Sequence, residues 1–390
     1  MKKTLVLLLV LAMVFSLAAC AKDTTTETTT AVVETETATE TEAEVATSDI
    51  ELIAFCSDVG TIDDESFNQY SYAGVVSVCE ANGIEYEYFI PSEDTTEQRQ
   101  TNIRQAVSDG AACIVVTGYM YGEALAWAAV EYPDVNFIGI DVSEYDIVSY
   151  IDAIPENVVS IVYHEEQAGY LAGYAAVKDG YTDLGFLGGM AVPAVVRYGY
   201  GYVQGADAAA AEMGTDININ YYYGGQFYGD ASITAKMEGW YSSGTEIVFA
   251  CGGGIYTSAV EAALNYDGKV IGVDVDQNYL GVNGVADGTF AYNPFVTSAY
   301  KGLQTSVEDV LKDFVAGSWT GGVSQNLGLA EGDYVGLPTA ADSWNFATFT
   351  TDEYEAVVAG IRDGSIAVDN SSDTTATPTV SEYTTVNYIS

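Results

Sequence analysis

The sequence predicts an α/β protein built from two Rossmann-like, doubly wound lobes joined by a hinge. Short apolar segments with strand character alternate with amphipathic helical segments from residue 51 onward. The alternation starts afresh after residue 160, so that a second series of elements mirrors the first. A chain of 390 residues, 48% of them hydrophobic, is long enough for two cores. Strand–helix alternation gives parallel sheets, because each helix carries the chain back to the start of the next strand.

The first lobe is expected to span residues 50–160. Gly83 and Gly110 follow two of its helical segments and Pro133 ends a third, as helix stop signals do. The expected strands cover residues 52–55, 84–89, 112–116 and 136–141, and the expected helices cover residues 66–82, 96–108 and 124–131.

The second lobe is expected to span residues 161–296, after a junction at residues 158–164 where His164 should make a structural hydrogen bond. A helix of about residues 297–317 is expected to return to the first lobe. Residues 318–390 should then supply crossing-back strands, a helix and a C-terminal extension. The expected helices of the second lobe are 165–177, 195–213, 231–241 and 256–265, and the expected strands are 184–187, 217–223, 247–250 and 270–274.

The first 49 residues differ in composition from the rest of the chain. Two lysines precede an apolar run over residues 5–17, and small residues then lead to Cys20. This pattern resembles the bacterial lipoprotein signal, in which the cysteine is lipidated and becomes the new first residue. We therefore expect a signal peptide over residues 1–19 and a Cys20 lipid anchor as the only link to the membrane. Residues 20–49 are acidic and rich in Thr and Glu, which predicts a disordered tether.

The charge excludes several classes of partner. Twelve basic and 56 acidic residues give a formal net charge of −44, and the folded part is itself acidic, with nine bases against 48 acids after residue 50. Such a surface repels phosphate backbones, so nucleic acid is not expected as a partner. A single His argues against His-rich metal sites and most Ser-His-Asp chemistry.

Acids and glycines gather where the expected strands end. Asp58, Asp141 and Asp274 each follow a strand, and Gly252 and Gly253 follow another. The carboxyl ends of parallel strands meet at one edge of an open sheet, which is where ligands bind in such folds. Carboxylates accept bidentate hydrogen bonds from a diol or an amino-imino edge, and glycine lets a ligand approach the backbone closely. A cleft for a ligand that carries such a group is therefore predicted between the lobes.

Several segments together carry a family resemblance over about residues 50–315. The chain resembles the basic membrane protein, or purine nucleoside receptor, family of substrate-binding lipoproteins of ABC transporters. This resemblance implies the type I periplasmic-binding-protein fold, a Venus-flytrap arrangement that closes around a nucleoside. The matching segments are DDESFNQ at 63–69, HEEQAG at 164–169, GFLGGM at 185–190, GGG at 252–254, GVDVDQ at 272–277 and TSAYK at 297–301.

The resemblance also implies ligand-binding residues in the first lobe. Asp58 matches a family acid at the ligand, and Phe67 matches the aromatic residue that stacks on the base. Asn68 lies beside Phe67, and Asp141 matches a further acid of the cleft. Read without the family, Phe67 could be a core residue and Asp58 a turn or helix-cap acid.

In the second lobe the resemblance implies five further ligand-binding residues. Tyr198 falls where the family places an aromatic residue opposite the first. Gly252 and Gly253 match a glycine turn, and Asp274 matches the acid that holds the ribose hydroxyls. Lys301 matches the lysine of a Thr-Ser-x-x-Lys segment and could offset Asp274 or Asp58. An exposed helix position is the alternative for Lys301.

The function implied is that of an extracytoplasmic, lipid-anchored, monomeric receptor. It would bind a nucleoside of the purine class and deliver it to the permease subunits of an ABC importer, with no cofactor, metal or catalytic residue. Three alternatives remain open from the residues: a sugar or autoinducer receptor of the same fold, a surface adhesin, and a nucleoside-processing enzyme built around Asp63 and Asp64.

Overall fold

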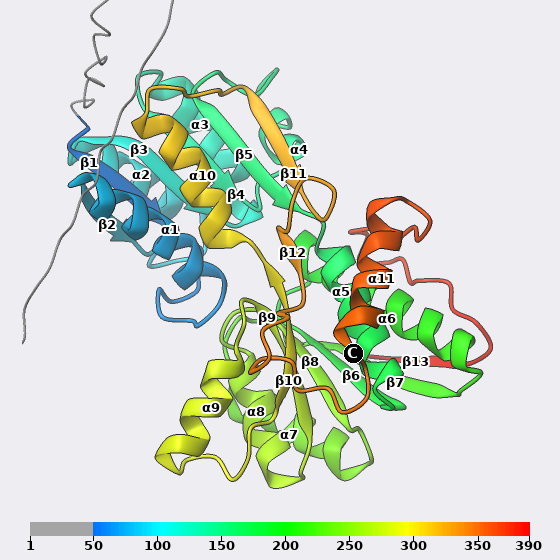
Figure 1. Ribbon diagram of the computed structural model, residues 1–390. Coiled ribbons are helices and arrows are strands. Elements are labelled where there is room, and N and C mark those ends of the chain that lie inside the picture. The colour runs from blue at the N-terminus through cyan, green and yellow to red at the C-terminus, as the bar shows by residue number, and fades with distance from the viewer. Residues whose placement is uncertain (1–49) are drawn as a thin grey trace, which may run out of the picture. The chain divides into compact units, whose positions relative to one another are not determined.

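The computed structural model describes residues 50–390, which belong to one compact unit (Figure 1). The expected signal peptide, Cys20 and the expected tether lie outside these residues. Within the described part of the chain, no helix is both long enough and apolar enough to cross a membrane.

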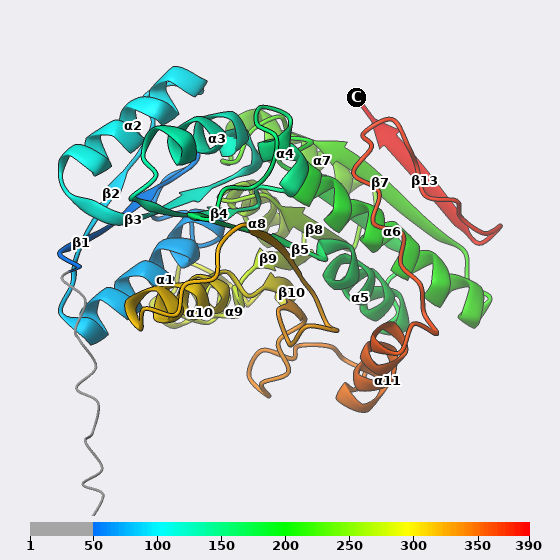
Figure 2. The ribbon, with the colours of Figure 1, turned by 90° about the horizontal axis from the view of Figure 1, so that it is seen from above.

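The first lobe is built on a six-stranded parallel sheet in the order β11-β5-β4-β3-β1-β2. Helices α1 and α10 cover one face of this sheet and α2 and α3 cover the other (Figure 2). Alternate side chains of its strands enter the two cores beneath these helices. The strands are β1 (Leu52–Cys56), β2 (Glu85–Phe89), β3 (Ala111–Thr117), β4 (Asn136–Ile140), β5 (Val158–Tyr163) and β11 (Val323–Leu327). The helices are α1 (Phe67–Asn82), α2 (Thr96–Ser108), a 3-10 turn at Tyr119–Tyr121, α3 (Gly122–Glu131), α4 (Glu144–Val148) and α10 (Leu303–Val315).

The second lobe holds a seven-stranded sheet in the order β12-β10-β9-β8-β6-β7-β13, in which only the β10–β12 pair is antiparallel. Helices α5 and α6 cover one face, and α7 and α8 cover the other. The strands are β6 (Asp183–Gly188), β7 (Ile217–Tyr223), β8 (Ile247–Cys251), β9 (Lys269–Asp274), β10 (Phe295–Lys301), β12 (Val335–Gly336) and β13 (Thr384–Ile389). The helices are α5 (Glu165–Lys178), α6 (Pro193–Met213), α7 (Ala231–Ser242), α8 (Tyr256–Asn265), α9 (Asn278–Asp287) and α11 (Thr351–Arg362).

The two sheets repeat one strand order, since β6 to β10 occupy the positions that β1 to β5 occupy in the first lobe. The repetition extends to backbone detail at the strand ends. Asp141 follows β4 with a φ of +57°, and Asp274 ends β9, the equivalent strand, with a φ of +66°. Residues other than glycine seldom adopt this left-handed conformation, and when they do they concentrate at functional sites.

The segment from residue 297 corrects one expectation. Residues 297–301 do not begin a helix, because they belong to β10, a strand of the second lobe that is buried at six of its seven positions. Burial on both faces removes the alternation that marks an exposed strand, so this segment imitates a helical pattern. The returning helix is α10, which starts at Leu303 and packs against α1 as expected.

The chain passes between the lobes three times, after β5 at His164, after β10 at Gly302, and between β11 and β12 at residues 328–334. The crossings are bonded to one another. The His164 N–H donates to the Leu327 carbonyl at 3.0 Å, and the Gly302 N–H donates to the Tyr334 carbonyl at 2.6 Å. The hinge is therefore one connected structure.

His164 makes the structural contact predicted for it. Its Nδ1 lies 2.6 Å from Oε1 of Glu166, and this hydrogen bond raises the pKa of the imidazole. A Cβ on Gly328 would lie 2.7 Å from the His164 ring, so only glycine lets the third crossing lie this close to the first.

Candidate ligand-binding site

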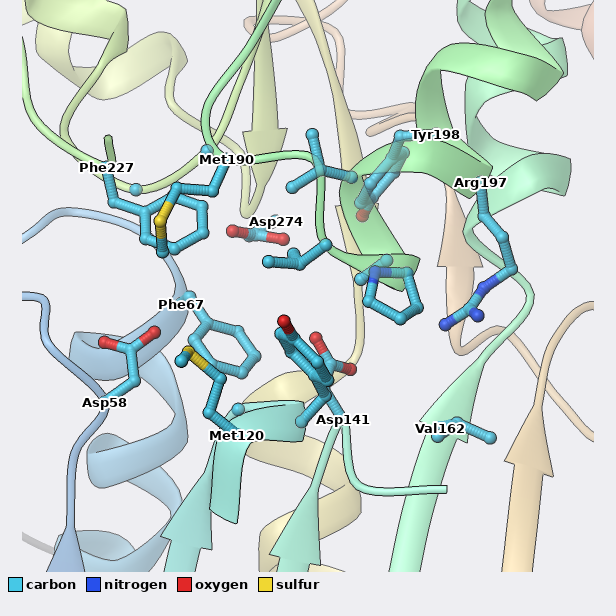
Figure 3. A pocket seen from close by; sticks show the side chains of 18 of the residues that line it. Asp58, Phe67, Met120, Asp141, Val162, Met190, Arg197, Tyr198, Phe227 and Asp274 are labelled. Atoms are coloured by element: carbon cyan, nitrogen blue, oxygen red, sulfur yellow. The ribbon is translucent and has the colours of Figure 1, made fainter. Parts of the chain in front are cut away.

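A cavity of about 440 Å³ lies between the two lobes, at the carboxyl ends of both sheets (Figure 3). The volume is within the usual range for sites that take small molecules. All nine residues predicted to bind ligand line it: Asp58, Phe67, Asn68, Asp141, Tyr198, Gly252, Gly253, Asp274 and Lys301.

One end of the cavity is an apolar slot formed by Phe67, Met120, Met190 and Phe227. Phe67 and Met120 come from the first lobe and Met190 and Phe227 from the second, and Figure 3 shows the two pairs on opposite sides of the cavity. One face of the Phe67 ring is occupied, since Lys301 Nζ lies 4.8 Å from its centroid. A flat apolar group entering from the other side would lie between the two phenylalanine rings.

Tyr198 is not placed to serve as the second aromatic face. Only 1% of the residue is exposed, and its ring packs edge-on against Phe249 with centroids 5.8 Å apart. Its hydroxyl donates to the Ala299 carbonyl at 3.3 Å. Phe227, which is half-buried, takes the position instead.

Sequence reasoning missed Phe227 because it lies in the loop after β7, where no periodic pattern fixes its direction. The predicted glycine turn is the one available signal. Gly252 and Gly253 have φ values of +147° and +51°, and a Cβ on Gly253 would lie 3.0 Å from the Phe227 carbonyl oxygen. The two glycines therefore give Phe227 the room to reach the cavity.

Asn68 organises the first-lobe wall. Its amide Nδ2 donates to Asp58 Oδ1 at 2.8 Å and to Asp64 Oδ2 at 3.2 Å, and its Oδ1 accepts from the Thr117 hydroxyl at 3.1 Å. Asp58 Oδ1 also accepts the Gly60 N–H at 2.6 Å. Burial raises the pKa of Asp58, while these two donors act to lower it. Asn68 thus aims the Asp58 carboxylate.

Asp64 caps helix α1. Its two carboxylate oxygens accept the backbone N–H groups of Ser66, Asn68 and Gln69 at 3.0 to 3.1 Å. Burial raises the pKa of Asp64 to about 6 even though these bonds favour the charged form. Its carboxylate oxygens are engaged by the backbone of α1. The alternative of a nucleoside-processing enzyme needs Asp63 and Asp64 to act together, and this contact removes Asp64 from such a pair.

The slot adjoins a carboxylate cluster, made of Asp141, Glu165 and Asp274 with the cations Lys301 and Arg197. Lys301 Nζ lies 2.6 Å from Asp141 Oδ2, 3.4 Å from Glu165 Oε1 and 4.0 Å from Asp274 Oδ1. Arg197 Nε holds the other oxygen of Glu165 at 2.6 Å. Lys301 is buried, so the exposed-helix alternative is wrong, and it pairs with Asp141 rather than with Asp58.

Burial governs the protonation of this cluster. It raises the pKa of Asp141 and of Asp274, while Lys301 opposes the shift in both. For Lys301 burial acts to lower the pKa, but Asp141, Glu165 and Asp274 outweigh it and the pKa rises. Asp141 Oδ1 is buried without a hydrogen-bond partner among the described residues.

A single protein-family model covers most of the residues that form the two lobes and the cavity. Residues 50–367 match the family model of the PnrA-like ABC transporter substrate-binding proteins. The chain belongs to this family. Of the described residues, only the extension 368–390, which carries β13, lies outside the match.

Three relatives are similar to most of this PnrA-like chain. The chain is 30% identical over 292 residues to the ABC transporter nucleoside-binding protein BmpA of Lactococcus lactis, covering 72% of this chain and 79% of that protein. It is 30% identical over 291 residues to Basic membrane protein B of Borreliella burgdorferi, covering 72% and 79%. It is 29% identical over 329 residues to the CD4+ T-cell-stimulating antigen of Listeria monocytogenes, covering 81% and 87%.

Solved structures support the two-lobed fold of this PnrA-like chain. A solute-binding protein of an ABC transporter system from Aeropyrum pernix superimposes with a TM-score of 0.64 at 22% identity, covering 82% of this chain and 88% of the other. A second solute-binding protein, from Conexibacter woesei, superimposes with a TM-score of 0.64 at 21% identity, covering 82% of this chain and 99% of the other.

As a PnrA-like member the protein is an extracytoplasmic substrate-binding protein and not an enzyme. Across residues 50–390 no three His, Cys, Asp or Glu side chains are arranged to hold a metal ion.

Proposed function

We propose that this protein is a lipid-anchored receptor that binds a nucleoside in the interlobe cavity and delivers it to an ABC importer. The observation that carries the proposal is that one cavity combines the apolar slot with the adjoining carboxylate cluster. The apolar slot suits a flat base, and the carboxylate cluster suits the hydroxyl groups of ribose. The relative from Lactococcus lactis, itself named as nucleoside-binding, supports the same ligand class.

The contacts are sufficient for useful affinity. Stacking of a base on an aromatic ring contributes roughly 1–3 kcal/mol, and a hydrogen bond to a charged group about 1.5–3 kcal/mol. A stack in the slot with two or three carboxylate hydrogen bonds sums to roughly 4–12 kcal/mol before the cost of ordering the ligand, a range that includes the about −8 kcal/mol of micromolar affinity. The aromatic pair Phe67 and Phe227 favours a nucleoside over a plain sugar.

The charge of the site favours a neutral nucleoside over a nucleotide. Five acids line the cavity against three bases: Asp58, Asp64, Asp141, Asp146 and Asp274 against Arg99, Arg197 and Lys301. Of these bases, Lys301 and Arg197 are already paired within the carboxylate cluster, and Arg99 pairs with Asp94. A phosphate would meet uncompensated negative charge, so nucleotides are disfavoured.

Calorimetric titration with inosine, guanosine, adenosine, cytidine and uridine tests the function. We expect micromolar or tighter binding of at least one purine nucleoside and much weaker binding of its 5′-monophosphate. Ribose alone is the control for the carboxylate cluster, and the free base alone is the control for the apolar slot. The absence of heat with all five nucleosides would contradict the proposal, and tight binding of ribose alone would favour a sugar receptor.

Replacing Phe67 by Ala should weaken the nucleoside and its free base to the same extent, because it removes a contact to the base. The expected loss is roughly 5- to 150-fold in affinity, the value of one base–aromatic stack. The exposed Tyr150 of the same lobe provides a control, since Tyr150→Ala removes an aromatic ring far from the cavity lining. An unchanged affinity in Phe67→Ala would exclude stacking on this ring.

A further inference from the structure

Three side chains that do not line the cavity join the two lobes beside it. In the first lobe, Glu65 lies in the loop between β1 and α1. In the second lobe, Gln277 immediately precedes α9 and Tyr279 lies in its first turn. The Gln277 amide donates to the Glu65 backbone carbonyl at 3.0 Å, and the Tyr279 hydroxyl donates to the Glu65 carboxylate.

Glu65 is held for these contacts by its own lobe. Its N–H donates to Gln69 Oε1 at 3.0 Å, and Gln69 Nε2 donates back to Glu65 Oε2 at 3.0 Å. The Glu65 backbone has a φ of +52°, in the left-handed region that is unfavourable for any residue other than glycine. Such a conformation persists only where surrounding contacts hold it.

Gln277 is held as firmly on the opposite side. Its backbone N–H donates to the Ser298 hydroxyl at 3.0 Å, and its Oε1 accepts the Val273 N–H at 3.1 Å. The residue is completely buried, and its amide nitrogen is the group that reaches the other lobe. If the lobes separated, this donor would lose the Glu65 carbonyl.

Tyr279 acts as a donor in this contact. Burial and then the bond to Glu65 raise the pKa of its hydroxyl, which therefore keeps its proton. A hydrogen bond between a hydroxyl group and a carboxylate is among the stronger kinds.

We propose that Glu65, Gln277 and Tyr279 form an interlobe latch that sets ligand affinity by stabilising the closed arrangement of the lobes, without touching the ligand. The latch forms only when the lobes are together, so it shifts the equilibrium between open and closed forms. A receptor whose binding-competent form is less populated binds every ligand more weakly by the same factor. The latch is thus a positioning device whose effect is independent of ligand chemistry.

The test compares the wild-type protein with Tyr279→Phe, which removes one hydroxyl and keeps the ring. Spin labels on exposed Tyr88 of the first lobe and exposed Tyr266 of the second, each replaced by Cys, report the distance between the lobes. With no ligand present, we expect Tyr279→Phe to increase the population of the longer distance about 10-fold. The dissociation rate of a bound nucleoside should rise and the affinity of all bound nucleosides should fall by a common factor.

Two further variants sharpen the result. Glu65→Gln combined with Tyr279→Phe should weaken binding little more than Tyr279→Phe alone, because Gln only weakens the acceptor of a hydrogen bond that Tyr279→Phe already removes. Tyr292→Phe is a matched control, since it removes a hydroxyl group that donates to the Ala263 and Gly268 carbonyls of its own lobe. The latch proposal rests on the proposed function only for the measurements of nucleoside affinity and dissociation, because the distance between the lobes is measured without ligand. An unchanged lobe distance in Tyr279→Phe overturns the latch even if nucleosides bind, whereas a protein that binds no nucleoside can still show the change in distance.

Discussion

Replacing Lys301 by Met is expected to lower the free energy of unfolding by about 3–5 kcal/mol at pH 8, the usual cost of removing one partner from a buried ion pair. Lys301 is the cation nearest to Asp141, and it also faces Glu165 and Asp274. Arg197 continues to hold Glu165, but Asp141 and Asp274 would become buried charges with no cation beside them. Urea denaturation followed by tryptophan fluorescence measures the loss.

The pH dependence of the Lys301→Met variant has a definite sign. Burial already raises the pKa of Asp141 and Asp274 in the folded protein, and without Lys301 only Arg197 for Asp141 and the Ser66 hydroxyl for Asp274 still oppose that rise. The folded state then takes up protons at a higher pH than the unfolded state, so its stability increases as the pH falls. The deficit relative to the wild type should therefore shrink between pH 8 and pH 5.

Lys312→Met is the matched control for that experiment. Lys312 lies on α10 with 57% of its side chain exposed, and it pairs with Glu308 one helical turn away. Such a surface pair contributes about 0.3–0.5 kcal/mol. Equal losses for the two lysine variants would contradict the account of the carboxylate cluster.

Replacing Asp274 by Asn should lower nucleoside affinity about 10- to 150-fold more than it lowers the affinity of the free base. This range corresponds to one hydrogen bond to a charged group, about 1.5–3 kcal/mol. Asparagine tolerates the left-handed backbone that Asp274 adopts, so the strand end is preserved. Parallel calorimetric titrations with a nucleoside and its base measure the difference.

Ser66→Ala separates the two contacts of Asp274. The Ser66 hydroxyl donates to Asp274 Oδ2 across the lobes at 2.5 Å, so the carboxylate also helps to hold the lobes together. Removing that hydroxyl should weaken the nucleoside and the free base alike. If Asp274→Asn also weakened both alike, its assignment to the ribose hydroxyls would be wrong.

Most secondary structure was predictable because strong local signals mark its boundaries. Gly83 ends α1 with a φ of +68°, and its N–H bonds to the Cys79 carbonyl, as a glycine stop signal predicts. The prediction failed where tertiary burial overrides periodicity, as in β10. It also omitted α9, whose small and polar residues give a weak pattern.

The site was predictable to the extent that it depends on strand ends. Asp58, Asp141 and Asp274 converge because equivalent strands of two similar sheets end at one cavity. Phe227 could not be predicted, since its direction is set by a loop that packs on glycines of another strand. The pairing of Lys301 with Asp141 joins residues 160 positions apart, and no local pattern encodes such a contact.

The three bonded crossings also determine how the lobes can move. A single connecting strand would permit both bending and twisting about its own axis. Here His164 is hydrogen-bonded to Leu327 and Gly302 to Tyr334, so the three connecting segments move together. Segments bonded in this way allow the lobes to bend apart but resist a twist of one lobe against the other. Opening should therefore follow a single arc and return Phe67 and Phe227 to the same alignment at each closure.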